Sequence, residues 1–483
     1  MIYDFNSYDK KLSSEYYDIC ICGAGAAGVT LAKTLAEKGK KVVLLEGGDE
    51  KYTQQSQDCY KGESVGMPYY LDSFRLRFLG GTTNHWSGRC RPFVKEDFFP
   101  KVINGLPGWP IEHVELERYL PGAKKILGLP EENTFKPIPG TIRFESQVFE
   151  PDESIVSEKP LRFGEKYAEL LSESTNIDLF INANTTEILL ENDSETVGKV
   201  IVKTFSGKED SVLADKYILC MGAIENARIL LNSNKQVEEG IGNKTDMVGR
   251  CFMEHFNVEM GSFIAEQGKW KNNLRMEYFT KPSYIRENKL GMANVTFYIT
   301  TKLKAYGRTK DIKKLFNRLS CEMGVSDKLQ FIYKHDCLGD GKISSLCEQF
   351  PNKESRITLG KEQDELGIPR VILDWKMSEA DERSIRHIVL EIAKEFAKNN
   401  LGRVKLASYI LDKESSIPTN IHSHQMGTTR MAARPEEGVV DSNCRVFDTK
   451  NLYIAGSSVF STGGGGNPTM PIVQLALRLA EHL

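Results

Sequence analysis

Apolar runs and a helical stretch alternate near the start of the chain in the order of a β-α-β unit. Residues 17–22 form a short apolar run that suits a buried parallel strand, and residues 41–46 form a second run that ends on Glu46. Residues 29–38, between them, have helical character and stop at Gly39, a residue type that commonly follows the last helical turn. The pattern predicts two parallel strands joined by a helix.

The chain has two further segments with the pattern of a buried strand. Residues 216–223 read as a strand that turns into a helix over residues 224–232, and residues 451–458 read as a strand that ends in small residues. A run of four glycines then leads to Pro468, which is favoured at the first position of a helix and here precedes a long apolar stretch to the last residue.

The region from about residue 251 to residue 418 has a different pattern. Apolar and polar residues alternate in runs such as 255–260 and 371–375, which favours a largely antiparallel sheet. We expect this sheet to form a substrate domain. The Lys-rich stretch from Lys302 to Lys328 is typical of a solvated helical face, and we expect an insertion at 300–345.

Composition excludes several classes of protein. The 483 residues carry 63 Lys and Arg against 66 Asp and Glu, a net charge of −3 without the basic excess of a nucleic-acid-binding protein. The ten cysteines include no C-x-x-C pair, and no metal-ligand set emerges from them and the eight histidines. We find no export signal and no membrane-spanning run, and therefore expect a cytoplasmic protein with no membrane or nucleic-acid partner. The forty glycines are the informative excess, because they cluster.

The first glycine cluster carries a specific chemistry. Gly23 permits a tight turn after the first strand, Gly25 allows the backbone to approach a pyrophosphate, and Gly28 allows the helix to pack closely on the strand. The start of the helix offers free N–H groups to the phosphates, and Glu46 can accept hydrogen bonds from ribose hydroxyls. The unit predicts a dinucleotide site but leaves NAD and FAD open.

Further segments, in their order along the chain, resemble the glucose–methanol–choline (GMC) oxidoreductase family. They include the loop LGGTTNHW at residues 79–86, ILCMGAIENARILL at 218–231, and Val248-Gly249-Arg250 followed by Glu254-His255. The resemblance continues through His424-Gln425-Met426-Gly427-Thr428 and Asn467-Pro468-Thr469, and is weak in residues 50–75, 125–170 and 270–345. The form of the loop at 79–86 looks most like the sugar-oxidising branch, with the pyranose oxidases and glycoside 3-oxidases.

The resemblance implies a fold and a division into domains. It implies an α/β protein with a Rossmann-like FAD-binding domain and a substrate domain built on a largely antiparallel sheet with helices, similar to p-hydroxybenzoate hydroxylase. The expected FAD-binding domain comprises residues 1–120, 175–250 and 425–483. The expected substrate domain comprises residues 121–174 and 251–424.

The resemblance and the glycine clusters together indicate the residues that hold FAD. These are Gly23, Gly25, Ala26, Ala27, Gly28, Glu46, Gly80, Gly81, Thr82, Thr83, Asn84, His85, Gly222, Ala223, Gly456, Ser457, Asn467, Pro468 and Thr469. In the pyranose-oxidase-like branch, a histidine at the place of His85 is joined covalently to the flavin. Asn84 and Ser87-Gly88 depart from that branch's pattern, so His85 is either the attachment point or, with Trp86, part of the wall around the flavin ring.

The resemblance places His424 and Asn467 at the family's catalytic pair. Oxidation of an alcohol by hydride transfer to flavin N5 requires loss of the hydroxyl proton, and a neutral imidazole is a suitable acceptor. Asn467 does not exchange protons near neutral pH but can orient the hydroxyl by a hydrogen bond. We assign His424 as general base and Asn467 as orienting residue. His422, which would share a face with His424 on a strand, and also His113 and His255, are expected to be structural.

The sequence therefore predicts an FAD-dependent oxidase or dehydrogenase that acts on CH–OH groups of a small alcohol, preferably a sugar, glycoside or cyclitol. Oxygen or a soluble acceptor such as a quinone would take the electrons. A sterol or aliphatic alcohol remains an alternative substrate. A lyase or decarboxylase on the same fold, or an inactive flavin-binding protein, remains an alternative of another class, and the oligomeric state is not predicted.

Overall fold

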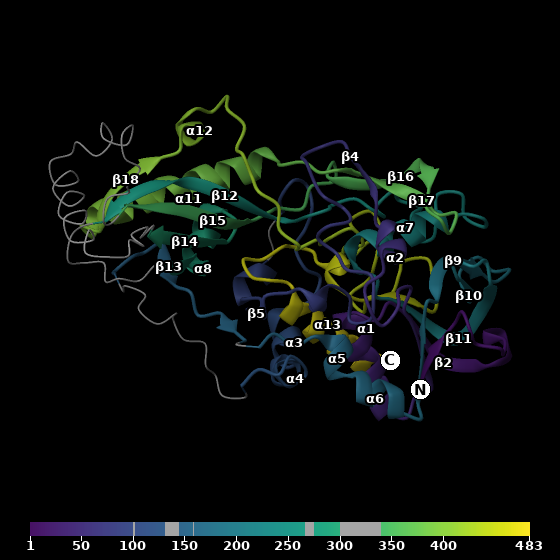
Figure 1. The fold of residues 1–483 in the computed structure, drawn as a ribbon. Helices are drawn as coiled ribbons and strands as arrows, with labels where there is room; N and C mark the ends of the chain where they lie inside the picture. Colours follow the sequence, from purple (N-terminus) through teal and green to yellow (C-terminus); the bar gives the residue numbers. More distant parts are fainter. Residues whose placement is uncertain (100–101, 131–143, 158, 266–274, 300–339) are drawn as a thin grey trace, which may run out of the picture.

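The computed structural model describes residues 1–99, 102–130, 144–157, 159–265, 275–299 and 340–483 (Figure 1). The expected Lys-rich helical face and most of the expected insertion at 300–345 lie outside these residues. Within them, no helix is both long and apolar enough to cross a bilayer.

The largest sheet has the strand order β1-β8-β3-β2-β11-β10-β9, with β19 paired to β11. The strands β1, β8, β3, β2, β11 and β19 pair in parallel, whereas β10 pairs antiparallel with both β11 and β9. The bounds are β1 (Ile2–Asp4), β2 (Tyr16–Cys22), β3 (Val42–Leu45), β8 (Ile177–Ile181), β9 (Asn184–Leu190), β10 (Val197–Lys203), β11 (Glu209–Leu219) and β19 (Leu452–Ile454). All four residues of β3 are buried, as expected for a parallel strand covered on both faces.

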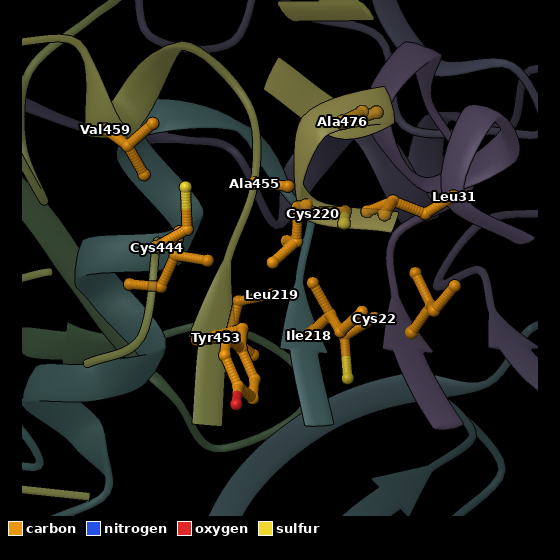
Figure 2. Close-up of a cluster of buried hydrophobic side chains, with 14 of the residues drawn as sticks. Cys22, Leu31, Ile218, Leu219, Cys220, Cys444, Tyr453, Ala455, Val459 and Ala476 are labelled. Carbon is orange, nitrogen blue, oxygen red and sulfur yellow. The ribbon is translucent and has the colours of Figure 1, made fainter. Parts of the chain in front are cut away.

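Two helices that lie far apart in the sequence pack against each other beside this sheet. They are α1 (Ala26–Glu37) and α13 (Thr469–His482). The helix α1 begins at Ala26, three residues before the predicted start, and α13 begins after Pro468, which is its N-cap and not its first residue. Figure 2 shows side chains from β2, β11 and β19 meeting those of α1 and α13 in one apolar core.

Every cysteine among the described residues is free and buried. They are Cys20, Cys22, Cys59, Cys90, Cys220, Cys251, Cys347 and Cys444. Three of them, Cys22, Cys220 and Cys444, are visible in the core of Figure 2. Burial raises the pKa of the thiols of Cys90, Cys347 and Cys444 to about 12.

A second sheet has the order β18-β12-β15-β14-β13-β6 and is antiparallel throughout, as predicted for this region. Its strands are β6 (Phe149–Pro151), β12 (His255–Ala265), β13 (Arg275–Thr280), β14 (Ala293–Ile299), β15 (Asp340–Glu348) and β18 (Gly402–Leu406). The long helix α11 (Glu379–Lys398) lies along this sheet on the left of Figure 1. Phe396 of α11 packs against the rings of Phe263 and Phe297, which closes the apolar face of the sheet.

The run 371–375 is not part of the antiparallel sheet to which we assigned it. Its residues belong to β17 (Pro369–Asp374), which pairs antiparallel with β16 (Arg356–Gln363) and in parallel with β4 (Gly62–Ser64). Alternation along one strand indicates that it has a buried and an exposed face, but does not indicate its neighbours. A further small sheet joins β5 (Arg89–Cys90) to β7 (Ile155–Val156).

Short helices connect the sheets. They are α2 (Gln54–Asp58), α3 (His113–Glu117), α4 (Leu120–Ile126), α5 (Phe163–Lys166), α6 (Ala168–Glu173), α7 (Gly222–Asn232), α8 (Pro282–Asn288) and α12 (Ser408–Leu411), with 3-10 turns at Leu12–Ser14, Gly81–Asn84, Lys95–Phe98 and Ser457–Val459. Within the segment 121–174, α4 packs against α13 and α6 against β8, whereas β6 joins the antiparallel sheet. The domain boundaries themselves stay a prediction.

Candidate active site

A cavity of about 980 Å³ lies between the largest sheet and the antiparallel sheet. It is lined by most residues that the sequence indicated, namely Gly23, Gly25, Ala26, Ala27, Glu46, Gly81, Thr82, Thr83, His85, Gly222, Ala223, His424, Gly456, Ser457, Asn467, Pro468 and Thr469. Segments from all along the sequence therefore converge on one site.

Three of the predicted residues do not line the cavity and instead shape the backbone around it. A Cβ at Gly28 would lie 1.9 Å from the carbonyl oxygen of Gly23, so this position holds helix and turn together. Gly80 has a φ of +90°, and Asn84 donates from Nδ2 to the carbonyls of Leu79 and Gly81, both at 3.0 Å. They support the loop but do not face the space where a ligand would bind.

The glycine-rich turn after β2 has room for a dinucleotide. A Cβ at Gly25 would meet no atom within 4 Å, and the same holds for Gly222 and Gly456, which have φ values of +87° and +114°. Glu46 Oε2 accepts a hydrogen bond from the N–H of Ala24 at 3.1 Å. The backbone is thus open toward the cavity at the start of α1, where N–H groups favour phosphate, and these residues fit an FAD.

Arg77 and Tyr60 also line this part of the cavity, and no sequence motif singled them out. The guanidinium of Arg77 lies so close over Gly47 that a Cβ there would be 2.4 Å from it. Its Nη1 donates to Ser56 Oγ at 2.9 Å. A cation at this place could face the phosphates of a bound dinucleotide, and the signal in the sequence was only a basic residue shortly before the loop at 79–86.

His424 and Asn467 meet inside the cavity. The Nδ2 atom of Asn467 lies 3.0 Å from Nε2 of His424. Asn467 directly precedes Pro468 at the start of α13, while His424 lies on a loop held by Met426, whose N–H donates to the carbonyl of Met253 at 2.9 Å. The structure therefore brings the predicted pair into direct contact.

His255 contacts the same imidazole from the other side, contrary to our expectation of a structural residue. Its Nδ1 lies 2.9 Å from Nδ1 of His424, and its Nε2 lies 2.8 Å from the carbonyl oxygen of Gly464. The only sequence signal was the Glu254-His255 pair in the family motif. Glu254, His255 and His424 each have an atom that could bind a metal ion, and these three atoms lie within 4.8 Å of one another. The Nδ1 atoms of the two histidines contact each other, however, and do not point at a common metal position.

A buried carboxyl group anchors the backbone of both histidines. Glu254 Oε1 accepts from the N–H of His255, and both of its oxygens lie 2.9 Å from the N–H of His424. The hydroxyl of Tyr69 donates to Oε2 at 3.2 Å. Burial raises the pKa of Glu254 to about 8.

Burial lowers the pKa values of the histidines in this cluster. The pKa of His424 lies well below its ordinary value, because of burial first and then of the neighbouring His255 and His422. The pKa of His422 is lowered to about 4 by burial and by His255. A neutral imidazole at His424 is therefore the favoured form near neutral pH.

His422 and His424 lie on a loop and not on a strand, so the shared face expected of a strand does not apply to them. Both nevertheless line the cavity, and their rings stack with centroids 5.5 Å apart. His113 lies elsewhere and donates from Nε2 to the carbonyl of Phe93 at 3.1 Å. His85 lines the cavity, and burial, followed by Arg162, lowers its pKa.

The antiparallel sheet presents a polar face to the cavity. Alternate side chains of its strands line the space, namely Asn257 from β12, Glu277 from β13, Asn294 and Thr296 from β14, and Ser344 from β15. The alternating residues of the opposite face are apolar and buried, among them Phe256, Val258, Tyr278, Val295 and Ile343. Glu277 forms an ion pair with Arg89, which also pairs with Asp152. Phe279 and Leu346 add apolar surface to the cavity side.

Comparison with known proteins agrees with a site for FAD in this chain. Residues 351–476 match the family described as GMC oxidoreductase, and residues 18–57 match the family described as FAD binding domain. A 2-methyl-1,2-propanediol dehydrogenase from Mycolicibacterium austroafricanum is 22% identical over 98% of this chain and 96% of its own length. A C-glycoside 3-oxidase from Microbacterium trichothecenolyticum is 22% identical over 91% of this chain and 79% of its own length.

Solved structures show the same fold. The crystal structure of pyridoxine 4-oxidase from Mesorbium loti superposes with a TM-score of 0.60 at 16% identity, over 96% of this chain and 99% of that one. The fold and the matched segments define the class: the protein is an FAD-dependent oxidoreductase that acts on CH–OH groups. Within that class, the match at residues 351–476 is to the GMC oxidoreductases, the family that the motifs of this chain resemble.

Proposed function

We propose that this enzyme oxidises a CH–OH group of a polyhydroxylated small molecule, such as a sugar, glycoside or cyclitol, with His424 as general base. The observation that carries the proposal is the contact of 3.0 Å between His424 Nε2 and Asn467 Nδ2 inside the cavity. When bound, FAD supplies the acceptor for the hydride.

The protein's own side chains orient the substrate hydroxyl and accept its proton. A substrate hydroxyl that displaces the Asn467 amide from His424 can donate its hydrogen bond to Nε2 and then transfer its proton there. Asn467 Nδ2 has two hydrogens and can donate to the hydroxyl oxygen, which fixes the direction of the C–H bond. The neutral form of His424 is required, and its lowered pKa keeps this form available.

The polar face of the antiparallel sheet supports a polyhydroxylated substrate. Glu277, Asn294, Thr296 and Ser344 offer both donors and acceptors to the cavity. A sterol would cover these polar groups with apolar rings and offer them few hydrogen bonds in place of water, which costs free energy in a buried site. A substrate with several hydroxyl groups would offer them hydrogen bonds in place of water.

We also propose His85 as the attachment point for the flavin. It lines the cavity, and the neutral form of its ring has one nitrogen that carries no proton. Acid precipitation of the holoenzyme tests this directly. Flavin in the pellet of the wild-type protein, and in the supernatant of a His85→Ala protein, is expected, and flavin in the supernatant of both would overturn the attachment.

Anaerobic mixing of the holoenzyme with a panel of sugars, glycosides, cyclitols, sterols and simple alcohols tests the function. Bleaching of the flavin absorbance by polyhydroxylated compounds is the expected result. Bleaching by sterols or aliphatic alcohols alone would overturn the substrate class. No bleaching by any alcohol, together with cleavage of a cyanohydrin or decarboxylation of a fatty acid, would overturn the oxidation itself. Repetition in air with measurement of hydrogen peroxide distinguishes oxygen from another acceptor.

A further inference from the structure

A chain of hydrogen bonds links the cavity to a backbone carbonyl through two histidines. It runs from Asn467 Nδ2 to His424 Nε2, from His424 Nδ1 to His255 Nδ1, and from His255 Nε2 to the carbonyl oxygen of Gly464, with lengths of 3.0, 2.9 and 2.8 Å. A carbonyl oxygen can only accept a hydrogen bond. The proton at this end of the chain must therefore be on His255 Nε2.

This one constraint fixes the direction of the remaining bonds. A neutral His255 with its proton on Nε2 has an unprotonated Nδ1, which can only accept. The bond between the two rings therefore requires the proton of His424 to be on its Nδ1. A doubly protonated His255 would allow the reverse, but this side chain is fully buried and burial lowers its pKa.

His424 is thereby left with an unprotonated Nε2, which is the atom that faces the cavity. The orientation of the Asn467 amide agrees with this direction, because Nδ2 can only donate and Nε2 then accepts. In the other tautomer, Nε2 would carry a hydrogen and point it at the Asn467 amide and at the substrate hydroxyl. That tautomer could not accept a proton at the place where the substrate binds.

We propose that His255 is a positioning residue that, with the Gly464 carbonyl, holds His424 in the tautomer whose Nε2 is free to accept the substrate proton. This inference rests on the proposed function, in which His424 is the base. It extends that function by a residue that does not touch the substrate and acts through another imidazole.

His255 also stabilises the product of the proton transfer. The substrate O–H bond breaks, an N–H bond forms at His424 Nε2, and the ring becomes an imidazolium. Its Nδ1–H then makes a charge-assisted bond to His255 Nδ1, which stabilises the cation. Because His255 is a neutral acceptor, it provides this stabilisation without the strong rise in basicity that a carboxylate would cause.

The other ionisable groups around the pair come from three segments. His422 stacks on His424 from the same loop, and Glu254, directly before β12, contacts the backbone of both histidines. Glu348 of β15 accepts from the N–H of Gly464 at 3.0 Å and raises the pKa of His255, against the larger effect of burial. These groups stay in place in the variants described next.

Three substitutions at one position test the proposal. His255→Asn places Oδ1 near the present Nδ1 and keeps an acceptor, His255→Leu removes it, and His255→Asp replaces it with a carboxylate. The rate of flavin reduction by substrate should fall about 100-fold in the Leu variant and stay within about threefold in the Asn variant. In the Asp variant, the acid limb of kcat/KM should move to higher pH, because a carboxylate favours the imidazolium.

The FAD content of each purified variant and its thermal unfolding serve as controls. A purely structural role predicts parallel losses of stability and rate, with the acid limb in the same place in all variants. That result would overturn the proposal, as would a Leu variant that reduces its flavin as fast as the wild type. If the Leu variant does not fold, the pH profiles of the Asn and Asp variants decide the question, because only the carboxylate should shift the acid limb of kcat/KM.

His424→Ala, measured in parallel, separates this inference from the proposed function. Rapid flavin reduction in the His424→Ala protein would overturn both. Slow reduction there, with an unshifted acid limb in the Asp variant, would overturn only the role of His255.

Discussion

Two walls of the same cavity present different kinds of surface. The glycine wall, formed by the turn at 23–28 with Gly222 and Gly456, offers backbone, and a Cβ at Gly25, Gly222 or Gly456 would meet no atom within 4 Å. The sheet wall, formed by one face of β12–β15, offers side chains such as Glu277 and Thr296. We therefore expect the site to recognise the cofactor through backbone at glycine positions and the substrate through polar side chains. His424 and Asn467 line the same cavity.

The largest expected effect separates chemistry from cofactor binding. His424→Ala should lower the rate of flavin reduction by about 10³-fold, because general base catalysis contributes at this scale. The FAD content should be unchanged, since the glycine wall is untouched. Rapid mixing under anaerobic conditions measures the rate. A protein that had lost its FAD would contradict the separation of the two walls.

The next prediction concerns the glycine wall alone. Gly25→Val should weaken FAD binding at least tenfold, because the new side chain extends into the cavity where the phosphates approach. Unfolding of the apoprotein should be unaffected, since Gly25 has a φ of −86° and open space around it. Fluorescence titration with FAD measures the affinity, and thermal unfolding measures the stability.

Gly28→Ala is the matched control in the same turn. Its Cβ would lie 1.9 Å from the Gly23 carbonyl oxygen, so it should destabilise even the apoprotein, by about 1–3 kcal/mol or more. If the Gly25→Val apoprotein unfolded at as low a temperature as the Gly28→Ala apoprotein, both glycines would be required for packing.

A smaller effect is expected on the sheet wall, where adjacent residues of β14 face opposite ways. Thr296→Val removes one hydroxyl from the cavity without changing the shape of the side chain. It should raise KM for the substrate about fivefold, the equivalent of about 1 kcal/mol for one hydrogen bond. Steady-state kinetics with the best substrate of the panel measures this.

Val295→Thr is the corresponding change on the apolar face. Val295 is fully buried, and a hydroxyl there should lower the free energy of unfolding by about 1–3 kcal/mol while KM stays the same. If Thr296→Val left KM unchanged for every substrate, the sheet wall would not be a recognition surface.

The smallest expected effect is the change of kcat/KM near neutral pH. The pKa of His424 lies well below its ordinary 6.5, and only the neutral ring can accept a proton. The value of kcat/KM should therefore rise with pH in the acid range and be level from about pH 6.5 to about pH 8. A rise between pH 7 and pH 8 that persists after Glu254→Gln, which removes the neighbouring carboxyl with a pKa of about 8, would show that the base is a different group or that its pKa is not lowered.

The glycine wall could be predicted from sequence because its function depends on residue type at fixed spacing. Gly23 needs its positive φ of +107°, and Gly28 cannot carry a Cβ, so few other residues could stand there. The strand and helix around the turn follow from apolar runs that pack locally. His424 and Asn467 could be assigned to one site only through the family motif, since they lie far apart in the chain.

The sheet wall and His255 could not be predicted in the same way. Alternation along β14 shows that Thr296 and Val295 face opposite sides, but which side faces the cavity depends on the register with β13 and β15. The parallel pairing of β17 with β4 was missed for the same reason. His255 became part of the site only because β12 carries it against a loop 169 residues away.

The rate at which a thiol reagent labels the buried cysteines can report local opening of the structure. A thiol reagent can reach Cys90, Cys347 or Cys444 only when the surrounding core opens, and their raised pKa values keep them unreactive until then. Cys90 lies in β5, Cys347 in the antiparallel sheet and Cys444 in the core beside β19. The labelling rate of each thiol therefore reports the stability of its own region, and a bound cofactor should slow the labelling of those regions whose opening requires its release.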